Sequence, residues 1–352
     1  MSEAMTLFSQ ALEQLRLAVL NVPGLTGLAE APFLFRPLVM VVLLGVVAGV
    51  IGVIVNLRSA EFSAEAMVHA VFPGIVAGAV YWGIDAIIPA ASVVAVVAAL
   101  VLTIVSHRSR RGEASEAGTA VVLTSFFSIG LILSLAKGDM SGQLEALMFG
   151  RLLEVTDARL AQALIVCAVA LLLIMATWKE QVAYAFDRTG ARASGLRLLM
   201  LDLVLNTAIA AAVVSASTAV GILLVIGYLV IPGATARILA SRVRTMVLVA
   251  IAVGVGGGYL GMLLMALPET LDKPISPQAT VALVMTGILL LAVCVAAVRE
   301  RLRRPARRAR SAQPATAVST STTASADATV DRAGGPEGSA SAVAPMAEGG
   351  RV

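Results

Sequence analysis

The sequence predicts an all-α fold: a polytopic bundle of transmembrane helices with about nine spans, or eight as the alternative. First, 59% of the 352 residues are hydrophobic and 14% are charged, and the mean hydropathy is +0.92; this composition excludes an ordinary soluble domain. Second, nine apolar stretches approach the ~19 helical residues that cover the ~30 Å hydrocarbon core. Third, basic and acidic loops alternate between these stretches.

The chain divides into three parts. Residues 1–35 mix charges with short apolar runs and contain Pro23 and Pro32, which favours an extracytoplasmic interfacial segment over a span. Residues 36–300 form the transmembrane domain. Residues 301–352 are mostly small and polar beyond the first arginines, which predicts a disordered cytoplasmic tail. The nine predicted spans are 38–55, 65–82, 87–105, 118–135, 160–178, 198–214, 220–236, 246–267 and 279–298.

Loop charge predicts the orientation. Arginine is in excess in the loops 106–111, 179–197 and 237–244 and in the segment 299–310, whereas the loops 83–86, 137–159 and 267–278 are richer in Asp and Glu. Because basic loops stay in the cytoplasm, the C-terminus is expected inside and the N-terminus outside. The net charge of +4 is thus explained by membrane orientation, and nucleic acid is not an expected partner.

Two spans contain residues that shape helix packing. Gly45, Gly49 and Gly52 lie in the first span, where small residues let neighbouring helices approach closely. Pro73 lies in the second span and lacks a backbone donor, so the helix is expected to bend there and to free the carbonyl of His69.

A carboxylate and an imidazole enter the second span. Glu65 and His69 are four residues apart, so a helix places them on one face, close enough to bind one divalent cation together. A charge in the bilayer centre costs about 2.5 to 3.5 kcal/mol, so the pair should face a partner, water or an ion. The alternative interpretation is an interfacial helix-start carboxylate and a hydrogen-bonded core histidine.

A second polar pair with the same spacing opens the sixth span. Asp202 and Asn206 are candidates for a translocation pathway. We favour the alternative, in which Asp202 lies near the cytoplasmic interface and bonds to neighbouring helices.

The chain lacks the motifs of several enzyme classes. There is no G-x-x-x-x-G-K-[ST] loop, so any ATP must be hydrolysed by another protein, and two histidines are too few for a His-rich catalytic zinc site. Met140-Ser-Gly-Gln143 resembles an ATPase signature only superficially, and Cys167 and Cys294 lie in apolar runs as small hydrophobic residues. We expect neither enzyme activity nor a permanently bound cofactor.

From Leu38 to about Arg301 the chain resembles the permease subunits of the ABC-3 family, the bacterial importers of manganese, zinc and iron. The most specific match is Glu65-Ala-Met-Val-His-Ala-Val-Phe-Pro-Gly74, which is similar to D-A-L-S-H-A-V-L-P-G of the family. Residues 185–196 are similar to S-F-D-P-E-x-A-R-A-L-G-L. Further matches are Thr124–Leu131, Val220-Gly-Ile-Leu-Leu-Val and Pro232-Gly-Ala-Thr-Ala-Arg237.

The resemblance implies an ATP-driven importer of Mn²⁺, Zn²⁺ or Fe²⁺ in the bacterial plasma membrane, with Glu65 and His69 on the metal path. Glu replaces the Asp of the family, which moves the ligand by about one methylene and leaves the metal preference open. It also implies a permease homodimer, two ATPase subunits and an extracytoplasmic metal-binding lipoprotein. The coupling helix that docks on the ATPase would include Phe186, Asp187, Ala191, Arg192 and Gly195.

Two other functions compete with this one. The first is an ABC permease for a metal chelate such as a siderophore or cobalamin, which would have more spans and no ligand pair. The second is an ion-coupled secondary transporter, which would need inverted repeats and discontinuous helices. An adjacent ATPase gene and a metal-binding lipoprotein gene would decide between them.

Overall fold

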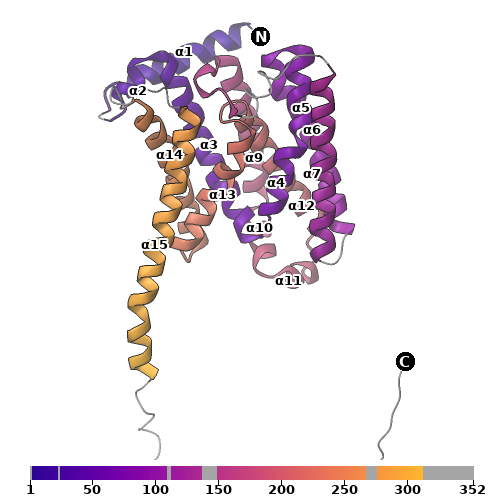
Figure 1. Cartoon of the computed structure of the whole chain (residues 1–352), viewed down its shortest axis with the longest axis vertical. Helices are drawn as coiled ribbons and strands as arrows, with labels where there is room; N and C mark the ends of the chain where they lie inside the picture. Colours follow the sequence, from indigo (N-terminus) through magenta and orange to yellow (C-terminus); the bar gives the residue numbers. More distant parts are fainter. Residues whose placement is uncertain (1, 23, 109–111, 137–148, 267–275, 312–352) are drawn as a thin grey trace, which may run out of the picture. The chain divides into compact units, whose positions relative to one another are not determined.

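The computed structural model describes residues 2–22, 24–108, 112–136, 149–266 and 276–311. The chain divides into two units, Met1–Glu300 and Arg301–Val352. The first unit is a helical bundle (Figure 1). In the second, the helix that begins at Pro277 continues to Ser311, so the first residues of the expected tail are helical. The expected loop structure at 137–148 and 267–275 and the tail from 312 onward lie outside the described residues.

Eight helical segments of the described chain are long and apolar enough to cross a membrane. This confirms an all-α multi-pass membrane protein and agrees with the lower of the two predicted span numbers. The eight are α3 (Pro32–Leu57), Glu61–Trp82, α6 (Ile87–Arg108), Glu116–Leu135 of α7 (Gly112–Leu135), α9 (Asp157–Ala176), α12 (Leu198–Ser217), Val243–Met265 of α14 (Val243–Ala266) and Pro277–Leu302 of α15 (Pro277–Ser311).

The segment expected as the seventh span forms α13 (Ile222–Leu239), an apolar helix of 18 residues, whereas the eight spans have 20 to 26 residues. It follows α12 after a short turn that ends at Gly221, where φ is +85°. Glycine adopts this left-handed conformation without the steric cost that a side chain would add. The turn uses Val220 and Gly221, which the prediction assigned to the span, so the helix begins two residues later than predicted.

Helix α3 lies at the centre of the bundle and packs closely against α14. A Cβ atom at Gly45 would lie 2.6 Å from the amide nitrogen of Val255, and one at Gly49 would lie 2.8 Å from the Cα of Ile251. Such distances exclude any side chain, so glycine sets how closely the two backbones approach. The hydroxyl of Tyr228 on α13 donates to the carbonyl oxygens of Val41 on α3 and Gly254 on α14, at 3.1 Å each. The expected role of the glycines is confirmed.

The second span is interrupted. It consists of α4 (Glu61–Ala70), α5 (Phe72–Ala77) and a π-helical turn, η1 (Gly78–Trp82). The interruption falls at Val71, and Pro73 stands in the first turn of α5, where a missing amide proton costs nothing. The structure therefore breaks the helix beside the Glu65 and His69 pair, as the proline predicted.

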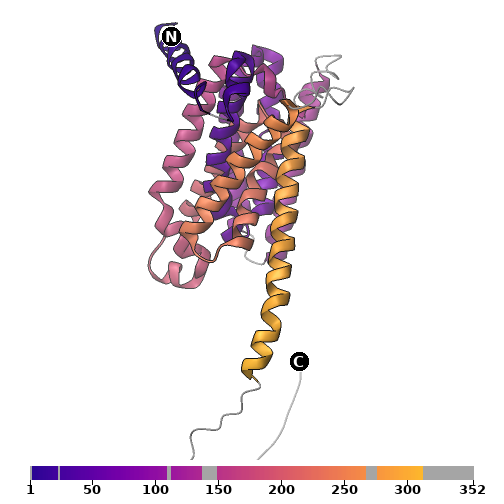
Figure 2. The same ribbon diagram turned by 90° about the vertical axis from the view of Figure 1, so that its left-hand side faces the viewer.

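At one end of the bundle, the N-terminal segment forms α1 (Ser2–Val19) and α2 (Thr26–Glu30). Figures 1 and 2 show α1 lying across the ends of the spans rather than among them. The hydroxyl of Ser9 donates to the Asp157 carboxylate at 2.8 Å, and Arg36 pairs with the same carboxylate at 2.5 Å. These bonds connect α1 and α3 to the start of α9.

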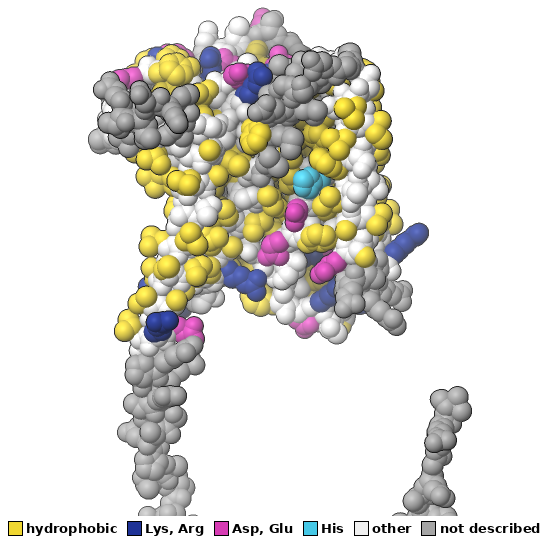
Figure 3. Space-filling view, viewed as in Figure 1, with side chains coloured by type: hydrophobic (Ala, Val, Ile, Leu, Met, Phe, Trp, Pro, Cys, Tyr) yellow, Lys and Arg dark blue, Asp and Glu magenta, His cyan; other side chains and the backbone are white. Residues whose placement is uncertain are grey.

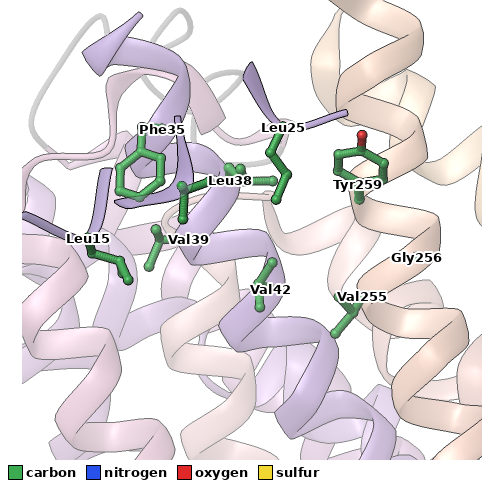
Figure 4. Close-up of a pocket in the computed structure, with 10 residues that line it drawn as sticks. Leu15, Leu25, Phe35, Leu38, Val39, Val42, Val255, Gly256 and Tyr259 are labelled. Atoms are coloured by element: carbon green, nitrogen blue, oxygen red, sulfur yellow. The ribbon is translucent and has the colours of Figure 1, made fainter. Parts of the chain in front are cut away.

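An apolar cavity of about 560 Å³ lies beneath α1 and α2, against α3 and α14 (Figure 4). Its lining side chains are hydrocarbon apart from the hydroxyl of Tyr259, which donates to the carbonyl oxygen of Gly24 at 2.5 Å. Hydrocarbon side chains cannot coordinate a metal ion, so this cavity is not the candidate metal site.

Two ion-pair clusters each join described segments that were predicted on the same side of the membrane. Arg159 pairs with Asp85 at 3.4 Å, which joins two loops that were both assigned outside. Arg58 pairs with Asp202, and the Nδ1 atom of His107 lies 3.7 Å from the same carboxylate, which joins three segments assigned inside. In Figure 1 the basic segment after α9 lies at the opposite end from α1; it forms α10 (Trp178–Phe186) and α11 (Arg188–Ala193).

Candidate functional site

Helix α4 presents its ionisable residues on one side and its apolar residues on the other. Glu61, Glu65 and His69 follow one another at intervals of four residues; Glu65 is exposed, and the other two are half-buried. The intervening Ala64, Ala66, Met67, Val68 and Ala70 are buried against the bundle. Figure 3 shows a histidine and acidic side chains among apolar side chains on one face of the molecule. Glu65 and His69 thus share an accessible face, as their spacing predicted.

The ring of His69 is held by packing. It meets the Phe127 ring of α7 edge-on, with centroids 5.3 Å apart and an interplanar angle of 81°. Phe127 in turn lies against Phe72, 5.1 Å between centroids, just beyond the helix break. The Nδ1 atom of His69 is buried and has no hydrogen-bond partner among the described residues. A buried polar atom without a partner is costly, so this nitrogen lacks the hydrogen bond that a structural core histidine would have.

One chain does not provide a complete metal site. Within the described ranges, no group of three or more His, Cys, Asp or Glu side chains could hold a metal ion. Glu65 and His69 supply one carboxylate and one imidazole, which is the donor set that Mn²⁺, Fe²⁺ and Zn²⁺ accept. Any further ligands must come from water, from backbone oxygens or from a second molecule.

Asp202 and Asn206 make contacts with neighbouring helices. The Asp202 carboxylate pairs with Arg58 at the end of α3. The amide of Asn206 donates to the hydroxyl of Thr103 on α6 at 2.9 Å, and both side chains are buried. In the described structure neither residue bonds to Glu65 or His69. These contacts are those of the alternative that we favoured from the sequence, and a role on the pathway stays a prediction.

Sequence reasoning missed the residues around Asp202. Arg58 ends α3 and was interpreted only as the close of the first span, yet its side chain is 9% exposed. It donates to Gln181 at 2.7 Å, and its Cζ atom lies 4.0 Å from the ring centroid of Tyr184. Burial and the nearby Asp202 carboxylate raise the pKa of Tyr184, while Arg58 opposes that shift. An amphipathic pattern in residues 179–197 was the only available signal for Gln181 and Tyr184.

The predicted coupling residues divide between the interior and the surface. Asp187 caps α11, accepting hydrogen bonds from the amides of Thr189 and Gly190 at 3.0 and 2.9 Å. Ala191 is buried in a small cluster with Tyr184, Leu198 and Leu201.

Phe186 and Arg192 are exposed, and 71% of the surface of Phe186 is accessible. Gly195 follows α11 with φ at +82°. Ala191 thus anchors α11 to the bundle, while Arg192 of α11 and Phe186 at the end of α10 lie on the surface.

The fold and the site together define a multi-pass helical membrane protein with an ionisable pair on an interrupted span. The family model of the ABC 3 transport family matches residues 30–296. The chain therefore belongs to the ABC 3 transport family.

Curated relatives and a solved structure are similar to this chain. The manganese transport system membrane protein MntC of Listeria monocytogenes is 33% identical over 239 residues, which cover 68% of this chain and 83% of that protein. The chelated iron transport system membrane protein YfeC of Yersinia pestis is 31% identical, covering 60% and 70%. PsaBC from Streptococcus pneumoniae, solved in complex with Fab, has a TM-score of 0.65 at 25% identity, covering 76% of this chain and 94% of that one.

Proposed function

We propose that this chain is the membrane permease subunit of an ATP-driven importer of divalent transition metal ions, Mn²⁺, Zn²⁺ or Fe²⁺. The observation that carries the proposal is the pair on α4: an exposed Glu65 one turn from His69, whose buried Nδ1 atom has no partner among the described residues. A hydrogen-bonded core histidine, the alternative from sequence, would have that nitrogen satisfied. Relatives named for manganese and chelated iron transport support the substrate class.

Two copies of the chain complete the metal site in this proposal. Each contributes one carboxylate and one imidazole, so a homodimer with α4 from both copies at its centre offers four ligands. Four ligands from two movable subunits can bind a divalent ion and then separate, which transport requires because the site must also release its cargo. A single closed four-ligand site would instead resemble a structural metal centre.

The importer in this proposal also contains an ATPase and a metal-binding lipoprotein. The chain has no P-loop, so a separate ABC ATPase supplies the energy and docks on Arg192 of α11 and on Phe186 at the end of α10. An extracytoplasmic metal-binding lipoprotein delivers the ion at the opposite end, beside α1. The protein resides in the bacterial plasma membrane, and the arginine-rich segment 299–310 supports a cytoplasmic C-terminus.

The test is metal uptake by the permease and its ATPase in proteoliposomes. His69→Ala and Glu65→Ala should reduce ATP-dependent Mn²⁺ uptake to the level of empty vesicles, and Glu65→Asp should retain more uptake than Glu65→Gln because it keeps the charge. Glu61→Gln is the matched control, since Glu61 lies on the same face one turn earlier. Wild-type rates of Mn²⁺ and Zn²⁺ uptake by His69→Ala would show that the pair is structural, and Asp202 and Asn206 would become the candidates.

A further inference from the structure

Arg58 connects three helices by three different interactions. Its guanidinium donates to the side-chain oxygen of Gln181 at 2.7 Å, pairs with the Asp202 carboxylate and lies 4.0 Å from the ring centroid of Tyr184. Gln181 and Tyr184 belong to α10, Asp202 to α12, and Arg58 itself to the end of α3. A planar, permanently charged guanidinium can form all three contacts at once, whereas a lysine ammonium cannot.

Tyr184 connects this cluster to α11. Its ring is buried with Ala191 of α11 and with Leu198 and Leu201 of α12. The Cζ atom of Arg188, the first residue of α11, lies 5.8 Å from the centroid of the same ring. The tyrosine therefore lies between the guanidinium of Arg58 and the surface helix α11, which carries Arg192. A displacement of α11 moves the aromatic ring against which Arg58 is packed.

On its other side, Arg58 is joined to α4 by a very short link. Only Ser59 and Ala60 separate it from Glu61, and Ser59 has a positive φ of 51°. Non-glycine residues rarely adopt this conformation, and they hold it where the surrounding structure imposes it. The amide of Ala60 donates back to Val55 of α3, and the carbonyl of Ala60 accepts from Ala64 of α4, both at 2.9 Å. Such a short, hydrogen-bonded link transmits a movement of Arg58 to the first turn of α4, one turn ahead of Glu65.

We propose that Arg58 is a positioning residue that transmits the movement of α11 to α4, and so sets the orientation of Glu65 and His69. The inference rests on the proposed function in one respect, the docking of an ATPase on α11. Arg58 does not touch the metal. Its role is to make the ligand pair respond to the nucleotide state of a subunit that docks at the end of the bundle.

The experiment measures hydrogen exchange on the full-length permease in complex with its ATPase in nanodiscs, without metal, in the presence and absence of ATP and vanadate. In the wild type, nucleotide should change the exchange of backbone amides in both α11 and α4. In Arg58→Gln the change in α11 should persist, and the change in α4 should be about two- to thirty-fold smaller, the range found for residues within coupling networks. Tyr184→Leu should likewise keep the change in α11 and reduce the change in α4, while it leaves the ion pair between Arg58 and Asp202 in place.

Arg237→Gln is the matched control. Arg237 donates to the carbonyl oxygen of Asn56 at 2.6 Å, so it holds the same end of α3 from α13 instead of from the coupling segment. This variant should keep the nucleotide response of α4. The inference is overturned if Arg58→Gln and Tyr184→Leu keep the wild-type response of α4, or if both variants also lose the response of α11. It is equally overturned if Arg237→Gln loses as much of the α4 response as Arg58→Gln does, or if α4 of the wild type does not respond to nucleotide. Because no metal is used, a failure of the proposed metal transport would leave this readout unchanged.

Discussion

The contact between Gly254 and Gly45 allows a direct test of how closely α3 and α14 pack. A Cβ atom at Gly254 would lie 2.6 Å from the carbonyl oxygen of Gly45 and 3.0 Å from its Cα, whereas a Cβ atom at Gly256, two residues later on the same helix, would meet nothing within 4 Å. Ordinary contact begins near 3.4 Å, so Gly254→Ala must separate the backbones by roughly 0.8 Å (3.4 − 2.6). Backbone atoms cannot rotate away as a side chain can.

The two alanine variants isolate the cost of that separation. Both gain the same helix propensity, up to about 1 kcal/mol relative to glycine. Only Gly254→Ala pays for overpacking, about 1 to 3 kcal/mol, and it also disturbs the hydrogen bond from Tyr228 to the Gly254 carbonyl oxygen. The free energy of unfolding of Gly254→Ala should therefore be about 1 to 3 kcal/mol lower than that of Gly256→Ala. Unfolding by SDS titration in mixed micelles, followed by circular dichroism, measures the difference, and equal values would refute the close packing.

Three further predictions concern the coupling segment, the pH dependence and the topology. Gly195→Val should lower ATP-dependent uptake without preventing membrane insertion, because φ is +82° at this position. Gly195→Asn should retain more uptake because asparagine tolerates that conformation. Equal uptake by the two variants would contradict the assignment of Gly195 to the coupling segment. Mn²⁺ uptake should fall as the pH becomes acidic, because a protonated imidazole cannot bind metal, and a flat uptake profile in proteoliposomes would count against His69 as a ligand. A tag at Val352 should resist protease added outside intact cells, and its cleavage would reverse the predicted orientation of the loops.

The sequence alone was sufficient for eight of the nine predicted spans and for the face shared by Glu65 and His69. Both depend on interactions that are local along the chain: about 20 apolar residues suffice to cross the hydrocarbon, and a spacing of four residues aligns two side chains on any helix. The break beside Pro73 was predictable for the same reason, because the missing amide proton acts within one turn. The turn at Gly221 was not predictable, because hydropathy does not distinguish the first turn of a helix from an apolar turn that precedes it.

Only the tertiary structure decided the partners of Arg58. The sequence places this residue at the end of a span, where an arginine is ordinarily explained by membrane orientation. Its partners Gln181, Tyr184 and Asp202 lie more than a hundred residues away in the sequence. Which of the many polar residues at this end of the bundle meet depends on which helices pack together. In a membrane that choice is made by close backbone contacts such as Gly45 with Gly254, because lipid is as apolar as the helix surfaces and hydrophobicity does not select partners.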